Sequence, residues 1–332
     1  MKKNLLLFAF LLMSVGGAFA EETGPKAMPV VEKFTGSWCG YCPAGIATFD
    51  MIEAEFHDEV IAIAYHLGDI MSIPLVNNCE LRKRIDGVPT AFINRGNEFG
   101  LYPSSAKYQL NQFSKIAPAS ISVKAKWTDE SKTGIAISTQ TQFTAAESSS
   151  YAIAYVLLAD GLKGSGSNWA QSNYYAGSSA SDPYLNVYCE KPSTITDMVY
   201  NHVAVDAWGL DFGVDGTIET PIVAGATQKY TYTVDISSNT IIQDKTKLTA
   251  VALLIDRSTN QIVNAAKVKV DGVVGEAEPG DLNEDGEIDV TDVVELIDIV
   301  LAGTFVAEAD INGDGEVDVT DVVELIDMVL GN

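Results

Sequence analysis

The chain has 332 residues, with 45 Asp and Glu against 21 Lys and Arg, for a formal net charge of -24 at pH 7. This charge excludes nucleic acid as a natural partner, and the length corresponds to two or three domains. Sixteen Asp or Glu and no Lys or Arg lie within residues 279–332, which indicates a cation-binding module there.

The first twenty residues have the pattern of a cleavable signal peptide. Lys2 and Lys3 precede the apolar stretch LLLFAFLLMSV, and AFA follows, ending at Ala20. The apolar stretch is shorter than the roughly 20 residues of a bilayer span, and no later segment is apolar enough to be a transmembrane anchor. We therefore expect an exported protein that is periplasmic, outer-membrane-associated or extracellular, where disulfides persist.

Strand and helix patterns alternate from residue 28 to residue 118. The segments MPVVEKF, VIAIAYH and VPTAFIN have the character of strands. The segments AGIATFDMIEAEFHD and SSAKYQLNQFSKI have apolar residues at helical spacing, and ELRKRID has the character of a short helix. The pattern predicts a small α/β domain.

From residue 119 to residue 271 the hydrophobic period changes to two. Apolar residues alternate with polar ones from Ile121 to Trp127, and further strands are expected at GIAISTQ, YAIAYVLLA, QKYTYTVDI, LTAVALLID and QIVNAAKVKV. Many strands separated by Gly, Ser and Asn predict an all-β sandwich. The segment DGVVGEAEPG that follows predicts a linker over residues 272–280.

The stretch SNWAQSNYYAG in this middle region carries Trp169, Tyr174 and Tyr175. Exposed aromatic rings on a loop form a stacking platform for a sugar or a protein partner. The alternative, which we favour, is a long loop folded over the sheet with its rings partly buried.

Two cysteines stand two residues apart in FTGSWCGYCPAG, where a strand is expected to give way to a helix. A zinc site needs three or four ligands, usually in two pairs, and the remaining Cys and His residues offer no second pair. Backbone N–H groups and the helix dipole stabilise a thiolate at a helix start, so Cys39 is the candidate nucleophile and Cys42 the resolving thiol. The alternative is a static disulfide on a binding scaffold.

Cys79 and Cys189 are the two cysteines left over. A disulfide between them would tie the α/β domain to the sandwich, and export permits it. Spacing does not determine distance, so two unpaired buried thiols are the alternative.

The segment WCGYC after a strand, with GVPT before a later strand, resembles thioredoxin. The resemblance implies a thioredoxin-like domain over residues 28–118, with Pro89 as the cis-proline that faces the cysteine pair. It also implies that Trp38, Val88 and Thr90 form the platform for an extended substrate. The Gly-Tyr dipeptide is similar to that of periplasmic disulfide isomerases.

One position departs from the thioredoxin pattern. Thioredoxins carry a buried acid six residues before the first cysteine as a proton relay, whereas this chain has Lys33 there, with Glu32 beside it. A lysine is not expected to act as that base. Either a bulge turns Glu32 inward or the relay is absent.

A thioredoxin-like head joined to such a β-domain resembles the twenty-eight-kilodalton outer-membrane-protein family of exported bacterial proteins. The match rests on EKFTGSWCGYCP, on the segment from Trp169 to Tyr175 and on the terminal strand pair. It implies association with the outer membrane or the cell surface.

A twelve-residue acidic loop occurs twice near the C-terminal end, from Asp281 and from Asp310, with Gly286 and Gly315 at the turn position. Oxygen ligands at positions 1, 3, 5, 7, 9 and 12 of such an EF-hand-type loop wrap one Ca²⁺. We therefore expect two calcium ions and no organic cofactor. The candidate ligands are Asp281, Asn283, Asp285, Glu287, Asp289 and Asp292 in the first loop, and Asp310, Asn312, Asp314, Glu316, Asp318 and Asp321 in the second.

Each loop precedes a VVELID helix without a clear helix before the loop, and position 12 is Asp instead of Glu. This pattern over residues 281–332 resembles dockerin, the duplicated module that attaches exported enzymes to cohesin-bearing scaffolds of polysaccharide-degrading assemblies. The resemblance implies a cohesin-like receptor contacted through two pairs of residues, Val290 and Thr291 or Val319 and Thr320. Many dockerins carry basic residues on these helices, where this chain has only acidic ones: Glu295, Asp298, Glu324 and Asp327.

Two functions follow for this multidomain chain. The leading hypothesis is an exported thiol-disulfide oxidoreductase that exchanges or isomerises disulfides of exported proteins and is tethered by its dockerin-like tail. The alternative is a non-catalytic outer-membrane or surface component. Its tail recruits it to a polysaccharide-degrading complex, and Cys39 and Cys42 form a static bond.

Overall fold

The computed structural model describes residues 24–147, 150–274, 279–282 and 288–330. The chain divides into two compact units. The first takes in the chain up to Val123 together with Ser138–Tyr230 and Thr240–Val268, and the second takes in Lys124–Ile137, Thr231–Asn239 and the chain from Lys269 onward. The expected signal peptide lies outside the described residues.

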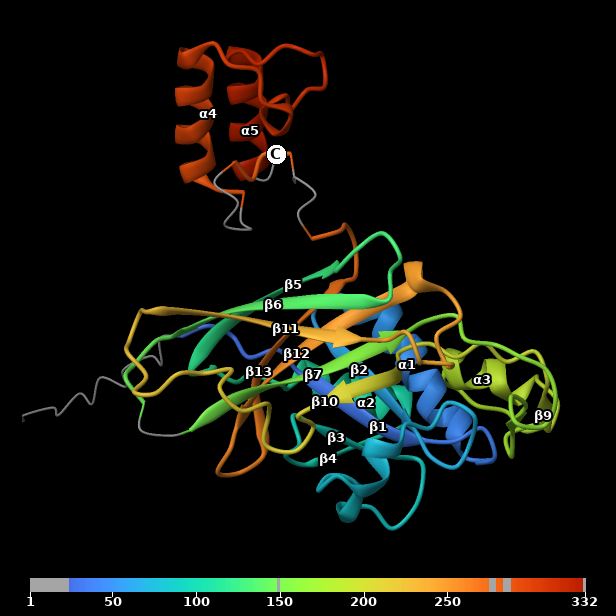
Figure 1. Ribbon diagram of the computed structural model, residues 1–332. Helices are drawn as coiled ribbons and strands as arrows, with labels where there is room; N and C mark the ends of the chain where they lie inside the picture. Colours follow the sequence, from blue (N-terminus) through green and yellow to red (C-terminus); the bar gives the residue numbers. More distant parts are fainter. Residues whose placement is uncertain (1–23, 148–149, 275–278, 283–287, 331–332) are drawn as a thin grey trace, which may run out of the picture. The chain divides into compact units, whose positions relative to one another are not determined.

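A mixed sheet of eight strands runs through the first unit (Figure 1) in the order β13-β12-β7-β10-β2-β1-β3-β4. β1 and β2 are parallel, and β3 is antiparallel to β1. Residues of β1, β2 and β7 are buried along their whole length. The apolar runs of β2 and β7 predict this burial, whereas β1 also buries Glu32 and Lys33. The strands are β1 (Val30–Thr35), β2 (Ile61–His66), β3 (Thr90–Ile93), β4 (Glu98–Phe99), β7 (Tyr151–Ala159), β10 (Val203–Trp208), β12 (Leu248–Asp256) and β13 (Gln261–Lys269).

This sheet joins the two segments that the sequence pattern assigns to separate domains. β10 makes the join, because it pairs in parallel with β2 and antiparallel with β7. The sequence analysis places no strand at β10. Residues 28–118 therefore do not form a sheet of their own. The expected domain boundary at Pro118 falls between strands that belong to one sheet.

The other strands of the middle region form smaller sheets. β5 (Ala119–Trp127), β6 (Gly134–Phe143) and β11 (Thr227–Asp235) form a three-stranded sheet in the order β11-β6-β5. β8 (Gln171–Ser172) pairs with β9 (Thr194–Ile195). The expected strands of the sandwich are thus present but divided equally, with β7, β12 and β13 in the eight-stranded sheet and β5, β6 and β11 in the three-stranded one.

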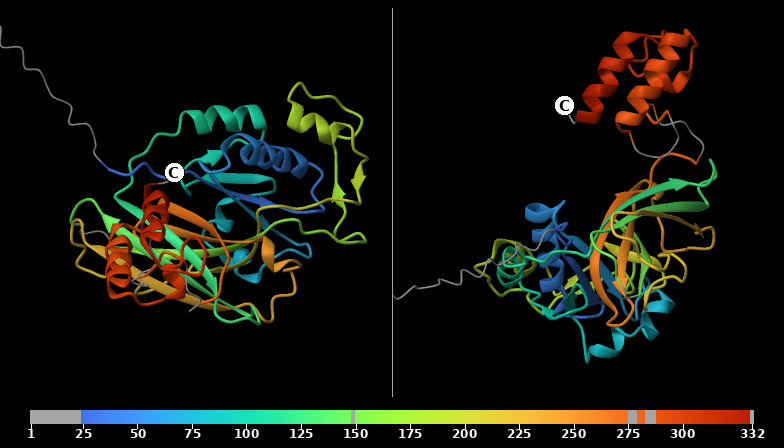
Figure 2. Two further views of the ribbon diagram at one scale, coloured as in Figure 1. Left: turned by 90° about the horizontal axis from the view of Figure 1, so that it is seen from above. Right: turned by 90° about the vertical axis from the view of Figure 1, so that its left-hand side faces the viewer.

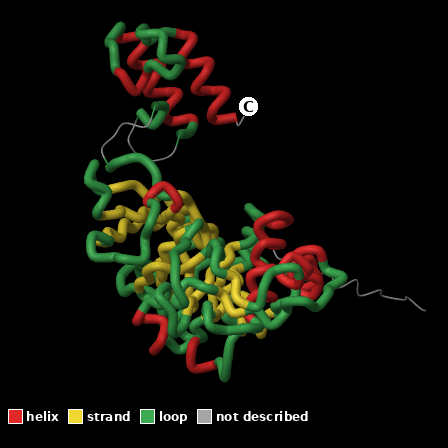
Figure 3. Tube along the Cα trace, turned by 90° about the vertical axis from the view of Figure 1, so that its right-hand side faces the viewer, coloured by secondary structure: helices red, strands yellow, loops and turns green. Residues whose placement is uncertain are grey.

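α1 (Cys42–Phe56) and α2 (Pro103–Asn111) pack on one face of the large sheet, and α3 (Pro183–Cys189) lies beside α1. α2 and α3 both contact α1 (Figure 2). In Figure 3, where helices are red and strands yellow, the helices lie outside the strands. α1 packs Phe49 and Ile52 on Val31 and Ala62 of the sheet. Because side chains alternate along a strand, Lys33 and Thr35 of β1 face α1 as well.

The opposite face carries a second apolar cluster that includes Phe34 and Tyr65. The 3₁₀ turn η1 (Pro74–Asn78) contributes Val76 to it, and Leu81 and Ile85 contribute from either end of a second turn, η2 (Arg82–Arg84). η2 stands where ELRKRID predicts a short helix. A third turn, η3 (Lys245–Lys247), precedes β12.

A buried ion pair lies on this second face. The Arg95 guanidinium donates two hydrogen bonds to the Glu32 carboxylate, at 3.0 and 3.1 Å. The Tyr65 hydroxyl donates to the same carboxylate at 3.0 Å. Arg95 also donates to the Leu210 carbonyl at 2.6 Å and to the Asn260 side chain at 3.1 Å. The pair therefore links β1 to loops more than a hundred residues away.

The C-terminal segment forms two helices, α4 (Val290–Ala302) and α5 (Val319–Leu330), with a 3₁₀ turn η4 (Ala307–Ala309) between them. Val293, Leu296 and Leu325 are buried where α4 meets α5. α4 starts with a capping box of Asp289 and Asp292. Among the described residues, no helix combines the length and apolar character needed to cross a membrane.

Arg95→Met leaves the Glu32 carboxylate buried without its countercharge. We expect this change to lower the free energy of unfolding by about 3–5 kcal/mol. Urea unfolding followed by intrinsic fluorescence measures it. Lys83→Met is the control, because it breaks the exposed Lys83–Glu80 pair and should cost less than about 1 kcal/mol. Equal small losses in the two variants would contradict a structural role for the buried pair.

Candidate functional site

The two cysteines of WCGYC form a disulfide at the N-terminal end of α1, with their Cα atoms 5.4 Å apart. Cys39 is 5% exposed and Cys42 is fully buried. Pro43 lies in the first turn of α1, where its missing N–H leaves no helical bond unmade. The pair is therefore oxidised and almost wholly shielded from solvent in the structure.

The loop before β3 faces this disulfide. The Val88–Pro89 peptide bond is cis, and the Val88 carbonyl oxygen lies 3.5 Å from the Cys39 sulfur. Thr90 begins β3, and its hydroxyl donates to the Gly87 carbonyl. Trp38 is exposed, and its indole N–H donates to the Leu67 carbonyl at 2.7 Å. The structure thus places Val88, the residue before Pro89, against the Cys39 sulfur.

Residues 171–174, the covering segment, run along the other side of the cysteine loop. The N–H groups of Ser172 and Tyr174 donate to the Ser37 and Gly40 carbonyls at 2.7 and 2.8 Å. The Gln171 side chain donates to the Cys39 carbonyl at 2.8 Å. A Cβ atom on Gly40 would lie 2.4 Å from the Tyr174 ring, so only glycine allows the ring to rest on this loop. The segment restricts access to the disulfide.

The aromatic residues of SNWAQSNYYAG separate in the structure. The Tyr174 ring is 68% exposed and meets the exposed Tyr41 ring edge-on at 5.1 Å. The Tyr175 hydroxyl lies 3.3 Å from that of Tyr102. Trp169 is half-buried, with its ring against Gly164. The stretch is thus a loop with partly buried rings, and its exposed member lies beside the cysteine pair.

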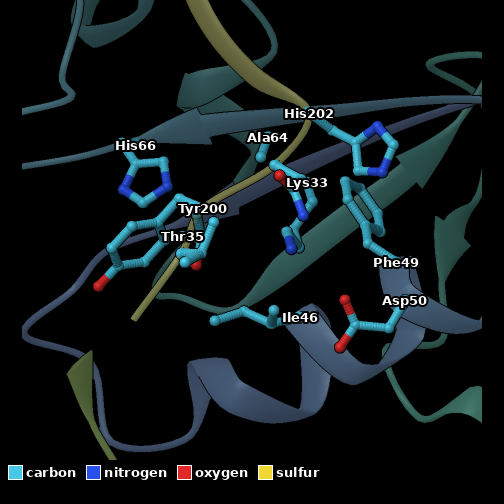
Figure 4. Close-up of a pocket in the computed structure, with 11 residues that line it drawn as sticks. Lys33, Thr35, Ile46, Phe49, Asp50, Ala64, His66, Tyr200 and His202 are labelled. Atoms are coloured by element: carbon cyan, nitrogen blue, oxygen red, sulfur yellow. The ribbon is translucent and has the colours of Figure 1, made fainter. Parts of the chain in front are cut away.

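A cavity of about 20 Å³ lies between α1 and the sheet, lined by residues of β1, β2, α1 and the loop 199–202. This volume suits one water molecule. Figure 4 shows the Lys33 amine in the middle of the group, with Phe49 and Asp50 on one side and Thr35 on the other. The cavity is therefore centred on a basic side chain.

Lys33 is a buried amine with few polar contacts. Its Nζ donates to the Gly45 carbonyl at 3.0 Å and lies 3.8 Å from the centre of the Phe49 ring. Burial lowers the pKa of Lys33 to about 7, although the negative charge of Asp50 acts to raise it. The amine is therefore about half protonated at neutral pH.

Asp50 lines the same cavity and is exposed to solvent. Its carboxylate accepts a hydrogen bond from the Tyr188 hydroxyl at 2.9 Å. The surrounding protein atoms desolvate the carboxylate and so raise the pKa of Asp50, while the Tyr188 hydrogen bond and the charge of Lys33 act to lower it. The sequence analysis missed Asp50, because an acid on an amphipathic helix carries no signal that it meets a buried lysine.

The structure decides between the two expectations for Glu32. β1 pairs with β2 and β3 in unbroken register, so no bulge turns Glu32 toward the cysteines. Glu32 instead faces Arg95 on the opposite side of the sheet. Lys33 instead occupies the position beneath α1. A lysine with its ordinary pKa is a poor base because it stays protonated, but the lowered pKa of Lys33 allows it to act as one.

The expected bridge between Cys79 and Cys189 is not formed in the structure, where both residues are free and buried. Cys79 belongs to the apolar cluster with Phe34 and Tyr65. Cys189 ends α3, which packs on α1 over the opposite face of the sheet. The sheet therefore separates the two thiols, and burial raises the pKa of Cys79.

The second acidic loop winds its side chains around its own backbone. The Asp310 carboxylate accepts the N–H groups of Asp314 and Gly315 at 3.0 and 2.9 Å. Asp321 is buried and accepts the N–H groups of Ile311 and Asp318. The candidate metal ligands of this loop are all oxygen atoms, which fits a hard cation such as Ca²⁺.

The first loop repeats part of this geometry. Buried Asp292 accepts the N–H groups of Leu282 and Asp289, each at 2.8 Å, in the same way as Asp321 in the second loop. Asn283, Asp285 and Glu287 lie outside the described residues. Within the described part of the chain, no three His, Cys, Asp or Glu side chains already converge on one point.

Two family models match the chain. The model of the outer membrane protein Omp28 matches residues 81–273, and that of the dockerin type I domain matches residues 279–330. The Omp28 match begins after Cys39 and Cys42, whereas the dockerin match contains both acidic loops. No curated protein matches the chain.

Among solved structures, HBP35 of Porphyromonas gingivalis is 16% identical, with a TM-score of 0.56 over 76% of this chain and 79% of that chain. At this identity the likeness shows a shared fold alone. A domain of the outer membrane lipoprotein Omp28 from Porphyromonas gingivalis is 16% identical, with a TM-score of 0.25 over 48% of this chain and 93% of that chain.

The pKa of Lys33 predicts how stability depends on pH. The amine has a pKa of about 7 in the folded chain, against an ordinary value of 10.5. Between these values the unfolded chain binds more protons, so the free energy of unfolding rises with pH. We expect a rise on the order of 4 kcal/mol from this group, absent in Lys33→Met.

Urea unfolding at pH 7, 8.5 and 10 tests this, with the difference between wild type and Lys33→Met as the measured quantity. The control is Lys115→Met, which removes an exposed amine and should shift stability equally at all three pH values. Parallel curves for wild type and Lys33→Met would show that the buried amine keeps its ordinary pKa.

Proposed function

The chain belongs to the outer membrane protein Omp28 family, and from this membership and its dockerin type I domain we propose a non-catalytic surface component that binds a cohesin-bearing partner through its C-terminal helices. In this proposal the signal peptide over residues 1–20 exports the chain to the outer membrane or the cell surface. The partner belongs to a polysaccharide-degrading complex.

The observation that carries this proposal is the exposure of equivalent residues in both repeats. Val290 and Val319 are 64% and 65% exposed, and Thr291 and Thr320 beside them are exposed too. These are the positions that the dockerin resemblance assigns to the receptor contact. An apolar residue held in water at the start of each helix supports a docking role, because its burial against a partner is favourable.

Calcium holds the module together in this proposal, with one ion in each loop. The hydrogen bonds of Asp310 and Asp321 to backbone N–H groups hold the second loop in its turn, and a bound ion would draw its oxygen ligands together. Asp292 and Asp289 support the same arrangement in the first loop. Sixteen acidic side chains within residues 279–332 repel one another, and bound cations offset this repulsion.

A static role for Cys39 and Cys42 is consistent with this function. The disulfide is shielded by the covering segment and lies outside the stretch that the Omp28 model matches. In this role it fixes the start of α1 beneath the loop that carries Tyr174.

A second candidate function is thiol-disulfide exchange by a thioredoxin-like head. It is favoured by one contact, the 3.5 Å approach of the Val88 carbonyl to the Cys39 sulfur beside the cis bond to Pro89. The strand order β2-β1-β3-β4, with α1 and α2 on one face, supports the same fold. A reduction potential far below about -300 mV would assign the pair a structural role.

Calorimetric titration of the full chain with calcium is expected to give two ions per chain. Asp310→Ala should lower the stoichiometry to one, because the first loop keeps its own ligands. Asp58→Ala is the control, since this exposed acid in the first unit belongs to neither loop. Absence of calcium binding at millimolar concentration would overturn the proposal for the tail.

Docking is tested by surface plasmon resonance of the full chain over immobilised cohesin domains. We expect binding in calcium and none in chelator, with loss of at least tenfold in affinity for the double variant Val290→Asp/Val319→Asp. Val187→Asp changes an exposed valine on α3 and should bind as wild type does. Binding by the double variant at full strength, with calcium still bound, contradicts the assigned surface.

A further inference from the structure

We propose that Lys33 exchanges a proton with the Cys39–Cys42 pair, donating to Cys42 when the disulfide is opened and accepting from Cys42 when it closes. This inference rests on the second candidate function, a reducible pair, and assigns its acid-base group. A cationic acid thus stands where the thioredoxin resemblance implies a carboxylic acid.

Position is the first support. Lys33 is the side chain of β1 that reaches under the start of α1, and its Nζ binds the carbonyl of Gly45. Gly45 lies three residues after Cys42, which is about one helical turn. The Cβ position of Gly45 is 3.0 Å from the Lys33 Cδ, so a larger residue there would displace the amine.

The cavity is the second support. Thr35 Oγ1 lines it, is fully buried, and has no hydrogen-bond partner among the described residues. A water molecule in a space of about 20 Å³ satisfies this hydroxyl and reaches the Lys33 amine beside it. The amine therefore has a polar neighbour through which a proton can move although Lys33 itself is buried.

A route to solvent is the third support. Asp50 lines the same cavity and is exposed, and its charge acts on Lys33. A proton passes between Lys33 and bulk water by way of this carboxylate. The titratable groups that face Lys33 or Asp50 from the surrounding elements are His66 on β2, Tyr188 and Lys191 at α3, and Tyr200 and His202 before β10; Glu53 on α1 acts in turn on His202.

The chemistry balances with a dithiol as reductant. A thiolate of the dithiol attacks the Cys39 sulfur, the bond between the two protein sulfurs breaks, and its electron pair goes to Cys42. The Lys33 ammonium stabilises this thiolate and gives it a proton. The second thiol of the reductant, after losing its proton to water, then displaces Cys39, so the dithiol is oxidised and both cysteines are reduced.

Closure runs in reverse. The neutral amine takes the proton of the Cys42 thiol, and the thiolate attacks the mixed disulfide at Cys39. Because the pKa of Lys33 is about 7, the amine is available in both forms near neutral pH. An ammonium beside the thiol also lowers the pH at which the thiolate forms.

The test follows closure in the reduced full chain, mixed with 5,5′-dithiobis(2-nitrobenzoate). The first thionitrobenzoate is released when Cys39 forms the mixed disulfide, and the second when Cys42 closes the bond. The rate of the second release, measured from pH 5.5 to 10, reports the thiolate of Cys42. In wild type its midpoint is expected near 7, as for Lys33.

Lys33→Met should move this midpoint to about 8.5 or above, the value of a free thiol, and slow the second release at pH 7 by about tenfold. The first release should change little. Asp50→Asn keeps the amine but removes the charge that favours its protonated form, so we expect a smaller loss at pH 7, about threefold. Because Asp50→Asn leaves Lys33 in place, it tests the proposal even if Lys33→Met does not fold.

The matched control is Lys267→Met. Lys267 is another partly buried lysine with a lowered pKa, and its amine donates to the His57 carbonyl at the far end of α1. Its loss should leave both releases unchanged. Equal second-release profiles for wild type and Lys33→Met overturn the assignment of Lys33 alone, whereas a disulfide that no dithiol reduces in the folded chain overturns the redox function with it.

Discussion

The ion pair between Glu32 and Arg95 is the constraint on which the rest of the first unit depends. It is buried, and its guanidinium also holds the Leu210 carbonyl and the Asn260 side chain. The strand that precedes the cysteine motif is thereby fastened to loops of the Omp28 stretch. Because neighbouring residues on a strand face opposite ways, the same contact commits Lys33 to the space beneath α1. One polar contact thus determines the side on which another is buried.

Much of the fold was accessible from the sequence because most strands are long apolar runs or clear alternations. The strands of both expected domains appear close to their expected positions. The prediction that failed was the grouping of strands into sheets. β10 is short and follows a loop, and its two neighbours in the sheet, β2 and β7, both lie more than forty residues earlier in the chain. Local pattern carries no information about which strands meet. The C-terminal repeat was easier, because its helices, loops and core lie within about fifty residues.

The candidate site divides in the same way. Cys39 and Cys42 are recognisable as a pair from their spacing, and Pro89 is assigned by the thioredoxin resemblance. The covering segment, Asp50 and the facing of Glu32 depend on tertiary contacts, so only the structure reveals them. The pairing of Cys79 with Cys189 failed for the same reason, because counting cysteines does not tell which side of a sheet each one occupies.

The two unpaired thiols bear on how the chain acquires its covalent structure. Four cysteines can be joined in three ways as two bridges, and only one of those includes the bond between Cys39 and Cys42. That bond closes the shortest ring available, which costs the least chain entropy. Cys79 and Cys189 are free and buried on opposite sides of the large sheet. The sheet itself therefore keeps the two remaining thiols from pairing in the folded chain.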